Sequence, residues 1–147
     1  MSNKFPLSQK YIDFINTTNV SAEFLEGTTA SGKTTVGAGV KFMRMVSQSP
    51  KKLHAIAAKN TGKAEETIIQ QDNGILDLHR NAVYCGNGDK DYKLPHIKFE
   101  GKIIYILGYS SRDKWEMVLG AQFGCVYIDE INTADIEFIR ETVSYTH

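Results

Sequence analysis

Apolar residues gather in short runs along this chain, and several of these runs have the length of a buried β-strand. LHAIAAKN at residues 53–60 and CVYIDE at 125–130 are two such runs, and VSAEFLEG at 20–27 reads as a strand that enters a turn. Two further runs, IKF and KIIYIL, are separated by Glu100-Gly101, a turn-like pair compatible with a hairpin. The pattern predicts a sheet of several strands.

Longer segments with helical spacing separate these strands. Residues 33–47 contain no proline and carry apolar side chains along one face, so they predict a helix that ends at Ser49-Pro50. Thr61 is a start signal for another helix, with an incomplete capping box but with two glutamates in its first turn. Shorter helices are predicted at 9–16, at 114–119 and from 133 onward. Strands alternating with helices predict an α/β sandwich with a mainly parallel sheet.

Length and charge narrow the class of protein. At 147 residues and 41% hydrophobic content, the chain can bury one core of ordinary size, so residues 1–147 are interpreted as a single domain. Seventeen basic and seventeen acidic residues cancel, which removes a global argument for a polyanionic partner. Nine of the basic residues but only three of the acidic ones precede residue 64. A phosphate-binding first half and a metal-binding second half would give this distribution, as would chance.

The cysteines and the apolar stretches exclude other classes. Cys85 and Cys125 stand far apart and away from any histidine cluster, so they indicate neither a zinc site nor a disulfide framework and are interpreted as small core residues. No stretch approaches the roughly 20 apolar residues of a membrane span, and the first residues contain no apolar signal segment. We therefore expect no membrane partner and a reducing, cytoplasmic setting.

The stretch GTTASGKT matches the phosphate-binding pattern G-x-x-x-x-G-K-[ST] at every fixed position. Glycine permits the dihedral angles with which such a loop turns its backbone N–H groups toward phosphates. The lysine can reach the β- and γ-phosphates, and the last hydroxyl can ligate Mg²⁺. A chance match in a turn is the alternative, but the motif lies between a predicted strand and a predicted helix, as the mechanism requires. The predicted nucleotide-binding residues here are Gly27, Thr28, Thr29, Ala30, Ser31, Gly32, Lys33, Thr34 and Thr35.

The run CVYIDE supplies the acidic partner that such a loop needs. Asp129 would hold the Mg²⁺ together with Thr34, and Glu130 would act as the general base toward the attacking water. The alternative is that both acids solvate a strand end or cap the next helix. An Asp-Glu pair favours ATP over GTP, since small GTPases position water with other groups.

The order of the motifs along the chain resembles the N-terminal ATPase domain of the large terminase subunit of tailed bacteriophages. These motifs are Gln9, the phosphate-binding loop, a strand that ends at Lys59-Asn60, Val118-Leu119-Gly120 and FGCVYIDEINTA. The resemblance covers roughly residues 7–140. It implies a P-loop NTPase fold, a three-layer α/β sandwich with a mainly parallel sheet. Within P-loop NTPases it implies the ASCE class, which is named for an additional strand and a catalytic glutamate. It also implies an ATP- and Mg²⁺-dependent motor that moves double-stranded DNA into the procapsid, in the cytoplasm of the infected host.

The resemblance assigns further roles and partners. Gln9 would recognise adenine, although a lone glutamine is almost as often a solvated helix residue. The partners would be the small terminase subunit and the portal, on which a homo-oligomeric ring would act. A basic neighbourhood of Lys41, Arg44, Lys51 and Lys52 is interpreted as a solvated face rather than a DNA contact.

Two departures from the family pattern stand out. Relatives often carry an arginine finger either in the phosphate-binding loop or just before the acidic strand. This chain has threonines in the loop, and Leu119 and Ala121 at the second position. Arg112 is the nearest catalytic candidate, followed by Arg80 and Arg140. The chain also ends before the family's coupling motif and nuclease domain, so it is expected to be an incomplete ATPase domain without nuclease activity. A helicase-like ATPase and a catalytically silent nucleotide-binding fragment remain as alternatives.

Overall fold

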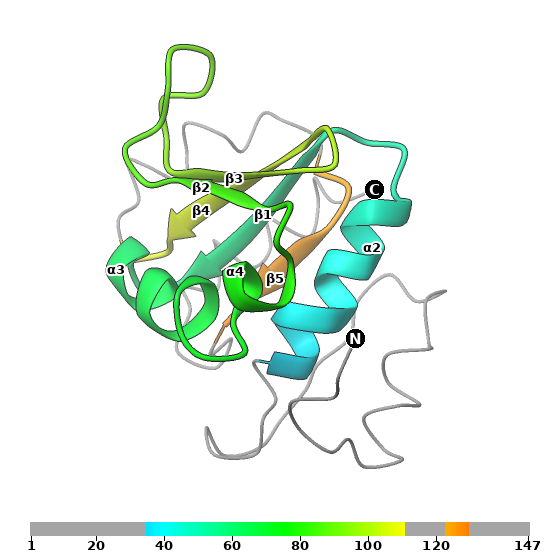
Figure 1. Cartoon of the computed structure of the whole chain (residues 1–147). Helices are drawn as coiled ribbons and strands as arrows, with labels where there is room; N and C mark the ends of the chain where they lie inside the picture. The colour runs from blue at the N-terminus through cyan, green and yellow to red at the C-terminus, as the bar shows by residue number, and fades with distance from the viewer. Residues whose placement is uncertain (1–34, 111–122, 130–147) are drawn as a thin grey trace.

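The structure is a computed structural model, and it describes residues 35–110 and 123–129. A five-stranded sheet forms the centre of this part of the chain. The strands lie in the order β2-β3-β4-β1-β5 (Figure 1). Their bounds are Leu53–Ala58 for β1, Val83–Cys85 for β2, His96–Phe99 for β3, Lys102–Gly108 for β4 and Val126–Ile128 for β5. The predicted strand at 20–27 and the predicted helices at 9–16, 114–119 and beyond 133 lie outside the described residues.

The sheet is mixed. Strand β1 pairs in parallel with β4 on one side and with β5 on the other, whereas β2, β3 and β4 form antiparallel pairs. The prediction of parallel strands is confirmed for β4, β1 and β5, and the described part of the sheet adds an antiparallel edge to them. The predicted hairpin is β3–β4: Phe99 pairs with Lys102, and Glu100 and Gly101 between them both have positive φ, 51° and 77°. A tight two-residue turn of this kind matches the twist of the strands.

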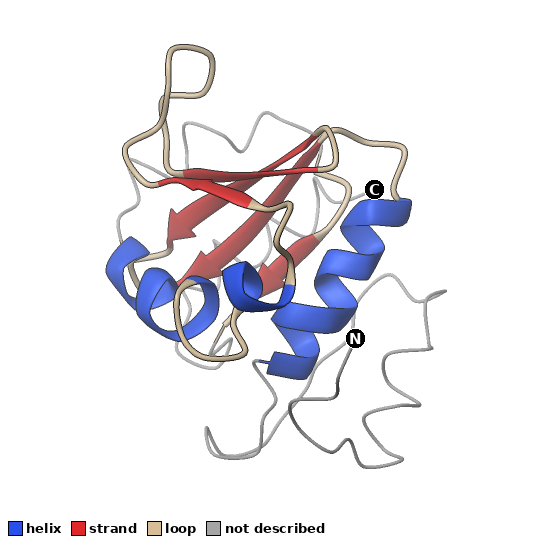
Figure 2. Ribbon diagram, viewed as in Figure 1, coloured by secondary structure: helices blue, strands red, loops and turns tan. Residues whose placement is uncertain are grey.

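The described helical segments gather on one side of the sheet (Figure 2). The helix predicted for residues 33–47 is present as two consecutive segments that end before Ser49-Pro50. The next helix is capped by Asn60, whose Oδ1 accepts a hydrogen bond from the Lys63 N–H, so its cap precedes the predicted start signal by one residue. The bounds are Thr35–Phe42 for the π-helical η2, Met43–Gln48 for α2, Thr61–Ala64 for α3, Glu65–Ile69 for the π-helical η3 and Ile75–Leu78 for α4.

Alternation along the strands divides the buried side chains between the two faces of the sheet. Ile56 on β1 and Ile104 and Ile106 on β4 face the described helices and pack with residues such as Phe42, Met43, Val46, Ile68, Ile69 and Ile75. Ala55, Ala57 and Leu107 face the other way and pack with Tyr109 and Phe123. The strands in the middle of the sheet are therefore buried on both faces, which explains why their sequences read as continuous apolar runs.

Candidate functional site

The parallel strands β4, β1 and β5 end at the same edge of the sheet, and Asp129 lies at this edge directly after β5. Its backbone N–H donates a hydrogen bond of 2.8 Å to the carbonyl oxygen of Ala57, which extends the ladder between β5 and β1 by one residue. The Asp129 side chain is 7% exposed. Asp129 therefore lies directly after a strand, as the sequence predicted, and its role as a metal ligand stays a prediction.

Tyr109 holds the same edge together from the other side. Its backbone N–H donates to the Ala58 carbonyl at 2.9 Å, and its hydroxyl donates to the Asp129 carbonyl at 3.3 Å. The residue is 6% exposed. Tyr109 therefore links the residue after β4 to the residue after β5, across the end of β1. Sequence reasoning did not single it out, although an aromatic residue directly after an apolar strand was a signal for it.

The segment after β1 is also fixed to the end of β4. The N–H and the hydroxyl of Ser110 both donate to the carbonyl oxygen of Lys59, at 3.1 and 2.5 Å. A Cβ atom on Gly108 would lie 2.9 Å from the Cα atom of Asn60, so glycine at this position allows the two chain segments to approach closely. The segments that follow β1 and β4 are therefore held together at the carboxyl edge by hydrogen bonds and close backbone packing.

The described part of helix η2 starts at Thr35, the residue that follows the GTTASGKT motif in the sequence. Its first turn lies at the end of the sheet where β1 and β5 terminate (Figure 1). The ring of Phe42 packs edge-on against Tyr127 of β5, with 6.2 Å between ring centroids, which fixes the helix to the strand that carries Asp129. The first described turn of η2 and the end of the acidic strand therefore lie toward the same edge of the sheet.

Two of the predicted site residues lie in the described part of the chain. Thr35 is half-buried at the start of η2, and Asp129 is buried at the end of β5. The other predicted residues lie outside the described residues, and their roles stay predictions: Gln9, Gly27, Thr28, Thr29, Ala30, Ser31, Gly32, Lys33, Thr34, Arg112 and Glu130.

The basic neighbourhood on and after the helix is not one solvated face. Lys41 is only 2% exposed and belongs to the buried side of η2, so the interpretation as a surface residue is wrong for it. Arg44 and Lys52 are exposed, and the Lys52 ammonium lies 5.7 Å from the centroid of the Tyr92 ring. Arg80, the second candidate for an arginine finger, is exposed as well.

The strand that precedes Asp129, β5, follows a buried hydrogen bond between Cys125 and His54. The N–H of Cys125 donates to Nδ1 of His54 at 3.0 Å, which joins the start of β5 to the start of β1. Burial raises the pKa of the Cys125 thiol to about 11, so the thiol stays protonated at neutral pH. This confirms the interpretation of Cys125 as a small core residue.

Two solved structures share this fold. The large terminase from a thermophilic bacteriophage, in crystal form 2, matches with a TM-score of 0.64 and 16% sequence identity over 96% of this chain. The same protein in complex with ADP, in crystal form 3, matches with a TM-score of 0.67 and 19% identity over 95% of this chain. In both cases the match covers 36% of the solved chain, so the present chain spans about a third of its length.

The remaining comparisons concern sequence. A search of curated proteins found no significant match. Among the described residues, no helix combines the length and apolarity needed to cross a membrane. A family model described as "Terminase large subunit, T4likevirus-type, N-terminal" matches residues 24–142, which contain the phosphate-loop motif, all the described strands and the acidic strand end. With more than half of its length matched by that model, the chain belongs to the family of phage terminase large subunits and corresponds to their N-terminal region.

Proposed function

We propose that this chain binds and hydrolyses ATP and, in its full context, supplies the energy that moves double-stranded DNA into a phage procapsid. The observation that carries the proposal is the family match over residues 24–142, because it includes both the GTTASGKT motif and the acidic strand end. The likeness to a large terminase solved in complex with ADP supports a nucleotide as the ligand. The finer fold proposed is the three-layer P-loop NTPase sandwich, with ATP at the carboxyl edge of β1 and β5.

The loop and the helix after it would bind the phosphates. Backbone N–H groups of residues 27–32 would surround them, and Lys33 would reach the β- and γ-phosphates. Helix η2 would contribute the partial positive charge of its N-terminal end, with Thr35 in its first turn. Its packing against Tyr127 would fix this end relative to the acidic strand.

The acidic residues would provide the metal site and the base. Asp129, held by the backbone contact with Ala57, fits the position of a carboxylate that binds Mg²⁺ together with the Thr34 hydroxyl. When bound, Mg²⁺ would neutralise charge on the β- and γ-phosphates. Glu130 would accept a proton from the attacking water.

Gln9 and Arg112 complete the proposed site. Gln9 would contact the adenine base, and Arg112 would stabilise the charge that develops on the transferred phosphoryl group. In well-studied NTPases such an arginine is worth about 10³ to 10⁵ in rate, so its identity decides whether the chain needs a neighbouring subunit for full turnover.

The proposed setting follows from the family. In the host cytoplasm, the whole protein would act as a homo-oligomeric ring with the portal, the small terminase subunit and double-stranded DNA as partners. The family match supports DNA packaging in general, and the specific partners are part of the proposal.

Nucleotide binding and hydrolysis test the proposal separately. Lys33→Ala is expected to abolish ATP binding in isothermal calorimetry, and Glu130→Gln to keep binding but to lower single-turnover hydrolysis by about 10²- to 10⁴-fold. Lys63→Ala and Glu66→Gln are matched controls because both side chains are exposed on the helices after β1. Neither control should change binding or rate.

The outcome separates the three hypotheses. A chain that does not bind ATP, with the controls intact, refutes the nucleotide site altogether. Equal, measurable rates for the native chain and Glu130→Gln would remove Glu130 from the mechanism, whereas weak ATP binding that Lys33→Ala does not change would favour a catalytically silent fragment. Stimulation of hydrolysis by single-stranded rather than double-stranded DNA would favour a helicase-like ATPase.

A further inference from the structure

Three metal-ligating side chains meet at the antiparallel edge of the sheet, away from the proposed nucleotide site. Cys85 ends strand β2, Asp89 lies in the loop that follows it, and His96 begins strand β3. One ligand atom from each lies within 4.8 Å of the other two. In the sequence Cys85 stands away from any histidine cluster, but the fold places the single histidine His96 beside it.

Strand pairing brings two of the three together. Cys85 and His96 are directly opposite each other in the β2–β3 ladder, so their side chains project from the same face of the sheet. Ten residues separate them along the chain, and these residues form the loop that projects beyond the sheet (Figure 1). The sulfur and the imidazole are therefore placed by backbone register, independently of the loop.

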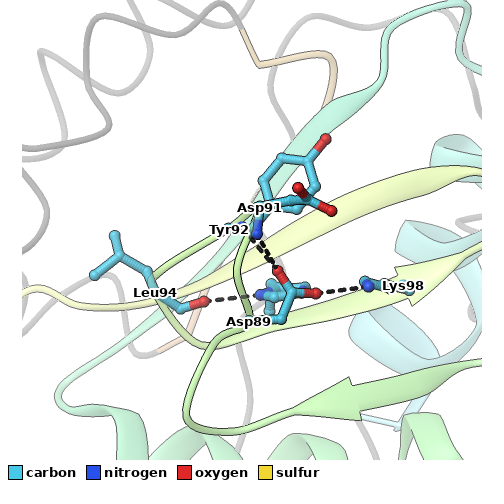
Figure 3. A network of polar contacts seen from close by, with 6 residues as sticks. Asp89, Asp91, Tyr92, Leu94 and Lys98 are labelled. Carbon is cyan, nitrogen blue, oxygen red and sulfur yellow. Dashed lines mark hydrogen bonds and ion pairs between the residues drawn. The ribbon is translucent and has the colours of Figure 1, made fainter.

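The loop folds back to bring in the carboxylate. Gly88 has a φ of 72°, and a Cβ atom there would lie 2.1 Å from the Lys93 carbonyl oxygen, so this turn requires glycine. Oδ1 of Asp89 accepts hydrogen bonds from the backbone N–H groups of Asp91 and Tyr92, at 2.9 and 2.8 Å (Figure 3). These bonds orient the carboxylate and leave Oδ2 directed toward the other two groups.

His96 has one ring nitrogen that the protein does not satisfy. Its side chain is 0% exposed, and Nδ1 lies 2.8 Å from the carbonyl oxygen of Leu94. Because a carbonyl only accepts, Nδ1 carries a hydrogen, and Nε2 of the neutral ring is then a bare lone pair. Within the described residues Nε2 has no hydrogen-bond partner, yet Oδ2 of Asp89 lies 3.4 Å away. A lone pair of a buried imidazole therefore faces a carboxylate oxygen that is 25% exposed, an arrangement that a cation between the two atoms would satisfy.

We propose that Cys85 Sγ, His96 Nε2 and Asp89 Oδ2 bind a divalent cation of the zinc class, with a fourth position open to water. The mixed sulfur, nitrogen and oxygen set suits zinc rather than Mg²⁺, which prefers oxygen ligands. Nitrogen and oxygen ligands at tetrahedral zinc lie about 3.3 Å apart, close to the observed 3.4 Å. The Nδ1–H bond to the Leu94 carbonyl is the outer contact that typically fixes a metal-binding histidine in this tautomer.

Lys98 is the competitor of the metal ion. Its ammonium lies 2.6 Å from Asp89 Oδ2 (Figure 3), and this bond holds the pKa of the Asp89 carboxyl well below its usual value. The Lys98 side chain is 46% exposed, so the ammonium can turn into solvent when a metal ion takes the carboxylate. The bound ion would close the loop of residues 86–95 onto the sheet edge.

Cobalt(II) is the probe for this site, because a cobalt–thiolate bond gives a near-ultraviolet charge-transfer band that a site made only of oxygen ligands lacks. Titration of the 147-residue chain is expected to show this band at one equivalent, and added Zn²⁺ should abolish it. Cys85→Ser should remove the band. Loss of a residue that only contacts a metal ligand lowers metal affinity by roughly 10- to 100-fold, and Asp89→Asn should lower the cobalt affinity by more than this because Asp89 binds the metal directly. Lys98→Met should bind at least as tightly as the native chain.

Cys125→Ser is the matched control, since that thiol is buried among core residues and should leave the band unchanged. Circular dichroism of each variant shows whether it is folded, and Cys85→Ser changes only a half-buried sulfur to oxygen. Absence of the band in the folded native chain, or its persistence in Cys85→Ser, would overturn the proposal.

Discussion

His54 joins the starts of β1 and β5, at the edge of the sheet opposite the strand ends where the nucleotide site is proposed. Its Nδ1 accepts a hydrogen bond from the Cys125 N–H at 3.0 Å, so Nε2 carries the hydrogen and donates to the Lys51 carbonyl at 2.9 Å. Burial lowers the pKa of this imidazole from its ordinary 6.5. A second proton on the ring would have to replace the contact with Cys125, because both nitrogens are already engaged.

We expect this histidine to make the fold sensitive to acid. The unfolded chain binds the proton more readily than the folded one, so the contribution is present above the unfolded-state pKa near 6.5 and is lost as the pH falls from there through the lower folded-state pKa. Urea unfolding of the native chain and of His54→Gln, each at about pH 8 and pH 5, measures the effect. His54→Gln should be less stable at pH 8 but should lose less stability on acidification. Equal losses in the two proteins would contradict the assignment.

Gly124 makes a further prediction at the scale of single residues. A Cβ atom at this position would lie 2.6 Å from Cε1 of His54 and 2.7 Å from Oγ of Ser49. Gly124→Ala is therefore expected to lower the free energy of unfolding by about 1–3 kcal/mol, the usual cost of overpacking. Gly62→Ala is the control, because its Cβ atom would meet only the Asn60 side chain at 3.4 Å. Similar chemical-denaturation midpoints for the two variants would show that the contact at Gly124 relaxes freely.

At the scale of elements, Lys102 connects helix α2 to the sheet. The Lys102 ammonium, at the start of β4, donates to the carbonyl oxygens of Val46 and Ser47 at 2.9 and 3.2 Å. These are carbonyls of the last turn of α2, where the helix dipole also favours a positive charge. Lys102→Met is expected to cost about 1–2 kcal/mol in urea unfolding, whereas the exposed Lys63→Met should cost little. If both substitutions have the same small effect, the cap does not stabilise the helix end.

The elements that could be predicted from sequence are those whose signals are local. The apolar run at 53–60, the turn at Glu100-Gly101 and the carboxylate after β5 were all placed correctly, because each depends on neighbouring residues. The meeting of Cys85 with His96 could not be predicted, since it depends on the register of β2 against β3 across an intervening loop. For the same reason, the link between Tyr109 and Asp129 was not found: it crosses three strand ends.

Hydrophobic pattern alone also misread some polar positions. Lys41 is only 2% exposed, although its sequence neighbourhood predicts a solvated basic face, because the sequence pattern shows the charge of a lysine but not the elements that pack around it. The helix is capped by Asn60 and not by the predicted Thr61. Either residue type can accept the hydrogen bond from a backbone N–H group, and the backbone geometry decides between them. Tertiary context, not composition, settled both positions.

At the scale of the whole molecule, the two proposed ligand sites lie on different strands of one sheet. The metal site uses β2 and β3, whereas the nucleotide site uses the ends of β1 and β5, and β4 and β1 separate β3 from β5. With neighbouring strands about 4.8 Å apart, β3 lies two spacings from β1 and three from β5, so the sites are separated by roughly 10–14 Å across the sheet. Perturbations farther apart than about 7–10 Å without shared contacts usually add in free energy.

Stabilisation by the two ligands is therefore expected to be additive. Either ligand at 100 times its dissociation constant should stabilise the folded chain by about 2.7 kcal/mol, which for a chain of this size raises the melting temperature by roughly 5–10 °C. Calorimetric melting with ADP and Mg²⁺, with Zn²⁺, and with both should then give a combined free-energy gain equal to the sum of the separate gains. Lys33→Ala should remove only the nucleotide part and Cys85→Ser only the zinc part. A combined gain that departs from the sum by more than about 0.5 kcal/mol would instead mean that the β2–β3 edge responds to the nucleotide through the shared sheet.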